Sequence, residues 1–179
     1  MSRENRQLRL RIRQVCIGLL AVGASKGSAL NYVVGITREM VGRFPQNNYV
    51  FFVDKNVGEM LPDTLPSNNT YKIHRVFPIV SANHFVRLLW MWFVLPVLLI
   101  RYRVTHLLCT GHFSPLVSPS RVVVALRNST YYSSRYNKQT NFARRVKNLI
   151  LRWQTGLSVA VASLCITPTA AMARRVRRY

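Results

Sequence analysis

Residues 14–28 read QVCIGLLAVGASKGS, and this stretch decides the fold. Residues 14–22 form an apolar run of strand length, which is typical of a parallel strand covered on both faces. A loop of small residues follows at 23–28. Apolar residues then recur at i, i+3, i+4 and i+7 from Leu30, which predicts a helix. A buried strand, a short loop and a helix together are the first unit of a parallel α/β fold.

The rest of the chain repeats this rhythm. Further strands are expected at 49–53, 71–76, 106–109, 122–126 and 164–166. Further helices are expected at 56–61, at 83–103 with a kink at Pro96, at 142–162 and from 169 onward. Alternating strands and helices predict the α/β class, with a parallel Rossmann-like sheet and helices on both faces. We expect a basic leader at 1–13 and one domain at 14–179, its final helix cut by the chain end. Residues 1–24 also have the pattern of a signal peptide, but the helix that follows at once favours a first strand.

The chain is strongly basic. It carries 26 Lys and Arg against 5 Asp and Glu, a formal net charge of +21, and residues 64–179 contain no acid. Since most hydrolytic and acid–base chemistry needs a carboxylate, the region after Asp63 must act through cations, hydroxyls, amides and histidines. Such a charge predicts anionic partners, namely nucleic acid, an acidic membrane surface or phosphorylated substrates. The cysteines lie in apolar runs without metal-ligand spacing, so no metal site is expected.

Candidate site residues follow the carboxyl ends of the expected strands, where ligands bind in such sheets. The loop at 23–28 opens a helix and is suited to an anion, although a plain tight turn explains it too. His112 follows the fourth strand and is the candidate catalytic residue, with a structural histidine as the alternative. Arg127 follows the fifth strand, and its guanidinium can bind a phosphate through two hydrogen bonds. An arginine that is only solvated is the alternative. The residues expected to bind acceptor or phosphate groups are Lys26, Gly27, Ser28, Arg127 and Asn128.

The helix expected at 83–103 combines aromatic and cationic side chains. Its apolar run at 88–100 is shorter than the roughly 20 residues of a spanning helix. We therefore expect it to lie on a membrane surface, and a core helix is the alternative. The residues assigned to that surface are Arg87, Trp90, Trp92, Phe93, Arg101 and Arg103.

Four stretches carry a resemblance to a known family. Residues 27–33 (GSALNYV) are similar to a glycine-rich turn followed by Tyr-Val, and residues 95–99 (LPVLL) to a helix ending in Leu-Pro-x-x-Leu. Residues 122–128 are similar to a strand that often ends in His-Asp. Residues 166–172 are similar to a turn that contains Ser. Together they resemble the N-terminal, acceptor-side domain of GT-B glycosyltransferases of the retaining family 4. Arg127 and Asn128 stand where that family often has His-Asp.

The resemblance implies a function for one half of such an enzyme. It implies a truncated or split, membrane-associated glycosyltransferase of polysaccharide biosynthesis, cytoplasmic and peripheral on the inner face of the cell membrane. This half would bind a lipid-linked or glycan acceptor and no cofactor, while the nucleotide-sugar donor would bind a second lobe. Two alternatives stay open: a basic nucleic-acid-binding protein, and a non-catalytic partner that recruits a separate catalytic lobe to the membrane.

Overall fold

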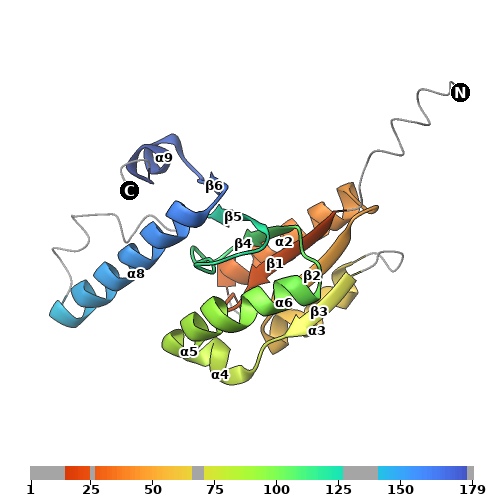
Figure 1. The fold of residues 1–179 in the computed structure, drawn as a ribbon, viewed down its shortest axis with the longest axis horizontal. Coiled ribbons are helices and arrows are strands. Elements are labelled where there is room, and N and C mark those ends of the chain that lie inside the picture. Colours follow the sequence, from red (N-terminus) through yellow and green to blue (C-terminus); the bar gives the residue numbers. More distant parts are fainter. Residues whose placement is uncertain (1–14, 25–26, 66–70, 127–140, 177–179) are drawn as a thin grey trace, which may run out of the picture.

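The protein is an α/β fold built on one parallel sheet (Figure 1). A computed structural model describes residues 15–24, 27–65, 71–126 and 141–176. The sheet has 6 strands in the order β3-β2-β1-β4-β5-β6, and each neighbouring pair is parallel. This is the strand order of the Rossmann fold, so the predicted fold class is confirmed. The strands are β1 Cys16–Ala21, β2 Asn48–Val53, β3 Tyr71–Arg75, β4 His106–Cys109, β5 Arg121–Ala125 and β6 Leu164–Ile166.

Helices cover both faces of the sheet. On one face, α2 (Gly27–Arg43) and α3 (Lys55–Thr64) pack over the first strands. On the other face lie the segments that connect β3 to β4 and, over β5, the helices at the end of the chain. The helical segments of this second face are α4 Pro78–Ala82, α5 His84–Leu89, η1 Trp90–Val94, α6 Leu95–Arg101, α8 Phe142–Val161 and α9 Ala170–Val176.

The apolar runs of the sequence become the central strands because those strands are buried on both faces. In β1, Leu19 packs into the core cluster under α2, while its neighbour Leu20 packs into the opposite cluster. In β2, Phe51 and Phe52 divide in the same way, and both are fully buried. Neighbouring side chains of a strand point to opposite faces, so a strand between two helical layers needs apolar residues at every position.

The helix expected at 83–103 appears as the continuous segment α5–η1–α6 from His84 to Arg101, with Asn83 as its N-cap and α4 as a separate short helix before it. The detail that differs is the kink, because η1 is a π-helical turn placed between α5 and α6. In this turn the N–H of Leu95 donates to the carbonyl of Trp90, five residues back. Pro96 then occupies the first turn of α6, where no N–H is needed. Proline interrupts the hydrogen-bonding pattern of an α-helix. Here the interruption is the π-helical turn η1, which precedes Pro96, rather than a bend at Pro96 itself.

The segment His84–Arg101 is long and apolar enough to cross a membrane by length and composition, with a mean hydropathy of 1.6 over 18 residues. In this fold it lies along the sheet instead. Leu88, Met91, Leu95 and Leu99 are buried against the strands. Of the residues of the segment 28% are buried, and the others are half-buried or exposed.

Candidate functional site

A pocket lies at the point where the strand order reverses, between the carboxyl ends of β1 and β4. Ligands of doubly wound sheets bind in the crevice at this switch point. The pocket has a volume of about 210 Å³. Its walls come from the ends of β1 and β4, the start of α2 and the α5–η1 segment. The lining residues are Leu20, Val22, Gly23, Ala24, Ala29, Arg87, Trp90, Met91, Thr110, Gly111, His112 and Phe113.

The turn after β1 is held by a buried carboxylate. Gly23 adopts a φ of 85°, a left-handed conformation that favours glycine. Its N–H donates to Oδ2 of Asp54 at 2.8 Å, and the hydroxyl of Ser81 donates to Oδ1 of the same carboxylate. Asp54 directly follows β2 and is 4% exposed. One carboxylate therefore joins the end of β1, the end of β2 and the end of α4.

Sequence reasoning missed Asp54 as a residue of the site and treated it only as the end of a strand. The signal was present, because Asp54 is one of 5 acids in the chain and follows directly on the run YVFFV at 49–53. A lone acid at the carboxyl end of a buried strand has few local donors. It must therefore find long-range partners or become exposed.

Arg87 lies at the pocket rather than on an outer surface, so its assignment to the membrane-facing set is wrong. Its Nε donates to the carbonyl of Val80 at 3.2 Å, and Nη2 donates to the carbonyl of Ser81. The guanidinium lies over Gly23, where a Cβ would stand 2.4 Å from Nη1. Burial lowers the pKa of Arg87, and the negative charge of Asp54 opposes that shift. The result is a half-buried, oriented cation in the wall of the pocket.

His112 is a second polar residue of the wall, and the structure brings it together with Arg87 as lining of one pocket. It is 9% exposed and has a φ of 69°, an uncommon conformation for a residue with a side chain. The preceding strand end is fixed by Thr110, whose hydroxyl donates to the carbonyl of Leu20 at 3.0 Å. Residues in this conformation cluster at active sites and ligand clamps but also occur elsewhere, as Arg103 does here with a φ of 52°, so for His112 it is the position in the pocket that points to a ligand.

Of the predicted anion-binding residues, the two that the structure describes, Gly27 and Ser28, do not line this pocket. Gly27 and Ser28 are exposed at the start of α2, and Gly27 has a φ of 60°. Lys26, Arg127 and Asn128 lie outside the described residues, as does the basic leader at 1–13. The loop after β1 contributes to the pocket through Gly23 and Ala24 instead.

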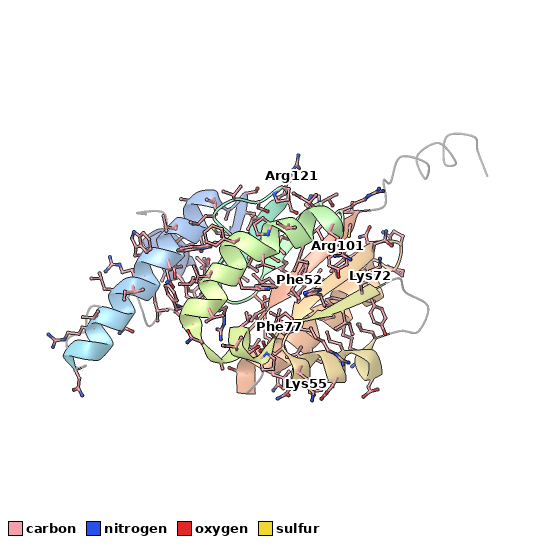
Figure 2. The ribbon with its side chains drawn as sticks, turned by 60° about the horizontal axis from the view of Figure 1, so that its bottom comes forward. Phe52, Lys55, Lys72, Phe77, Arg101 and Arg121 are labelled. Carbon is pink, nitrogen blue, oxygen red and sulfur yellow. The ribbon has the colours of Figure 1, made fainter. Side chains whose placement is uncertain are left out.

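The predicted membrane surface is partly corrected. Trp90 is 8% exposed and packs in the core, so its placement on that surface is wrong. Trp92 is half-buried, whereas Phe93 is 69% exposed. Arg101 and Arg103 are exposed at the far end of the segment, and Figure 2 shows Arg101 on the same side of the molecule as Lys72.

Metal chemistry has no ready ligand set here. Within 15–24, 27–65, 71–126 and 141–176, no group of three or more His, Cys, Asp or Glu is placed to hold a metal ion. The described lining of the pocket contains no carboxylate, and both oxygens of the nearby Asp54 accept hydrogen bonds from protein donors. What the pocket offers is one oriented cation, one histidine and apolar walls.

In comparisons with protein-family models, with curated proteins and with solved structures, nothing matched this chain. The structural class of the protein is therefore defined by its own features, namely the strand order, the helices on both faces and the switch-point pocket. The protein is a Rossmann-like α/β domain with an occupiable crevice at the position where such domains bind ligands.

Proposed function

We propose that this chain is the acceptor-binding half of a membrane-associated glycosyltransferase, and that its acceptor carries a phosphate. The observation that carries the proposal is the pocket at the β1–β4 switch point, whose wall holds Arg87 against Gly23. The sugar would come from a nucleotide-sugar bound by a second lobe. The acceptor would be a lipid-linked intermediate or a growing glycan.

The chemistry of the pocket supports an amphiphilic, anionic ligand. Backbone carbonyls orient the guanidinium of Arg87, and the nearby charge of Asp54 keeps it protonated in its half-buried position, so Arg87 presents an oriented hydrogen-bond donor to a ligand. An arginine fork binds phosphate through charge-assisted hydrogen bonds. The walls formed by Leu20, Met91 and Phe113 are apolar and suit the carbon face of a sugar or the first carbons of a lipid.

Each residue of the pocket has a role in this proposal. Arg87 anchors the phosphate, and His112 orients the hydroxyl that receives the sugar. Gly23 lets the backbone approach the ligand closely. Residues 26–28 and the pair Arg127 and Asn128 remain predictions for further contacts to the acceptor.

An exposed apolar stripe supports the membrane association. Along α5, η1 and α6, side chains spaced by three or four residues face outward, opposite the buried ones. An apolar face followed by arginines is typical of helices at the lipid interface. The members of the stripe are Phe85 (66% exposed), Leu89 (39%), Phe93 (69%), Val97 (62%) and Ile100 (64%).

The test compares two arginines as phosphate anchors. The probe is a short isoprenyl phosphate, with the matching isoprenyl alcohol as its uncharged control, titrated calorimetrically below its aggregation concentration. We expect Arg87→Gln to weaken phosphate binding by about 10- to 100-fold, the equivalent of one charged hydrogen-bonding group. Arg121→Gln should leave it unchanged, because Arg121 is exposed and points away from the body of the protein (Figure 2).

Two results would contradict the proposal. Equal affinities for the isoprenyl phosphate and the isoprenyl alcohol would mean that the protein does not recognise the phosphate group. Equal losses in both arginine variants would mean that general charge, rather than this pocket, binds the probe. Competition by single-stranded RNA that eliminates binding in wild type and in both variants alike would favour the nucleic-acid alternative.

A further inference from the structure

Helix α8 is turned so that a polar side faces the protein and an apolar side faces outward. Asn148, Gln154, Thr155 and Ser158 are all buried, with exposures of 0 to 6%, and Leu151 lies among them. A surface helix of a globular protein normally shows the reverse pattern. The inverted orientation requires both a reason why the polar side is held inward and a partner for the apolar side.

Hydrogen bonds hold the polar side inward. The Oε1 of Gln154 lies 3.0 Å from Nε2 of His84 on α5, and the N–H of Ser114 donates to the hydroxyl oxygen of Ser158 at 3.0 Å. The hydroxyl of Thr155 donates to the carbonyl of Leu151 at 2.7 Å, which satisfies it within the helix and makes no contact with another segment. Rotating α8 to bury its apolar side would break the bonds to the neighbouring segments. The observed rotation of the helix is therefore fixed by its polar contacts.

The outward side of α8 is apolar along several turns. Leu149 is 66% exposed, Trp153 59%, Ile150 48% and Val146 41%. Leu149 and Trp153 lie two residues before and after Leu151, which places both nearly opposite that buried side chain at about 100° per residue. Figure 1 shows α8 extending from the β5–β6 side of the sheet past its edge, and the exposed fractions of these side chains mean that this side is not covered by the described part of the fold.

The charges beside this apolar side have one sign. Arg145 and Arg152 are exposed and lie on one flank of the line through Leu149 and Trp153, while Ile150 lies on the other. Helix α8 contains no acid, and neither does any position from 64 to 179. Docking a second copy through this helix would bring arginines together with no acid from either helix to neutralise them.

We propose that α8 is a membrane-seating helix, whose outward side enters the boundary between headgroups and acyl chains of an anionic bilayer. Trp153 would lie at the interface, where tryptophan is favoured, and Arg145 and Arg152 would contact lipid phosphates. Nucleic acid fits less well, because it would engage the arginines and leave Leu149 in water. The inference rests on the proposed function, which states that the protein acts at a membrane surface. It adds a second contact beside the stripe of α5–α6, and the His84–Gln154 pair joins the two segments.

Tryptophan fluorescence provides the test. Trp153 is 59% exposed, whereas Trp90 is 8% exposed and Trp92 half-buried, so lipid insertion should change the emission of Trp153 most. The full chain is mixed with vesicles of about two thirds neutral and one third anionic lipid, with or without brominated acyl chains. We expect a blue shift and quenching by the brominated chains. Both should be lost in Trp153→Phe, while this variant still binds the vesicles.

Vesicle co-sedimentation at physiological salt gives the second measurement. Leu149→Ser combined with Ile150→Ser should lower partitioning by about 10-fold or more, since two apolar side chains no longer enter the lipid. Val117→Ser is the matched control, because Val117 is 73% exposed but lies in the β4–β5 connection. Circular dichroism checks that the fold of each variant is retained.

The outcomes decide whether the outward side of α8 binds lipid or another partner. Emission of Trp153 that is unchanged by vesicles overturns the proposal, as does equal partitioning of the double variant and the control. A blue shift that rises with protein concentration in the absence of lipid would assign the surface to a second copy and would also overturn it. The Leu149→Ser, Ile150→Ser double variant should still bind the isoprenyl phosphate in solution as the wild type does, because neither residue lines the pocket, so failure of the pocket and failure of α8 are separate results.

Discussion

Replacing Gly23 by alanine tests whether Arg87 is held over the turn after β1. The added Cβ would stand 2.4 Å from Nη1 and 2.8 Å from Cζ of Arg87, so the guanidinium must move. Alanine at a φ of 85° adds strain of about 1 to 2 kcal/mol by itself. Displacing Arg87 from the carbonyls of Val80 and Ser81 adds about 1.5 kcal/mol or more, because these hydrogen bonds involve a charged donor. We expect a total loss of about 3 kcal/mol in the free energy of unfolding.

A double-mutant cycle separates the two contributions. In an Arg87→Ala background, Gly23→Ala has no guanidinium to displace, so it should cost only the strain, about 1 to 2 kcal/mol. Gly27→Ala is the matched control, since Gly27 has a φ of 60° and its added Cβ meets nothing within 4 Å. It should cost about the same as the strain alone.

Equilibrium urea denaturation, followed by circular dichroism, measures all four members of the cycle and the Gly27→Ala control. A coupling energy of about 1.5 kcal/mol between Gly23 and Arg87 is expected. Additivity within the experimental error would refute the reasoning, because it would mean that Arg87 does not rest on this turn. A loss for Gly27→Ala as large as for Gly23→Ala would attribute the whole effect to backbone strain.

Three further predictions concern the core and its titrating groups. Trp90→Ala should destabilise the protein by about 3 to 5 kcal/mol in urea, whereas Phe93→Ala, at an exposed position, should change it by less than about 0.5 kcal/mol. Burial, and secondly the charge of Arg101, lower the pKa of His74 below its ordinary 6.5, so the folded state favours the neutral ring. Its contribution is therefore complete above pH 6.5 and is lost as the pH falls towards the folded pKa, and His74→Gln should flatten the decline in unfolding free energy across that window. Burial raises the pKa of the Cys109 thiol, so iodoacetamide should label Cys109 only after unfolding, as read by mass spectrometry of the native and denatured protein.

The sequence alone determined the fold class, because the pattern of apolar residues records how a strand is buried. The continuous run at 14–22 requires helices on both faces of β1, and the same argument holds for Tyr49–Val53 within β2. The expected strands all appear in the structure, with boundaries within one or two residues of those predicted. His112 lines the pocket for a related reason, since the segments that follow parallel strands lie at the ligand-binding edge of the sheet, and its catalytic role stays a prediction.

Only the tertiary structure decided which side chains share the pocket. Asp54 and Gly23 are 31 positions apart, and nothing local to either residue shows that one holds the other. The same limit explains the errors on Arg87 and Trp90, because helical spacing gives the angle between side chains but not the face that meets the sheet. Helix α8 is the clearest case. Its sequence shows an amphipathic helix but does not show which of the two sides faces the protein. The contacts of Gln154 and Ser158 with distant residues turn its apolar side outward.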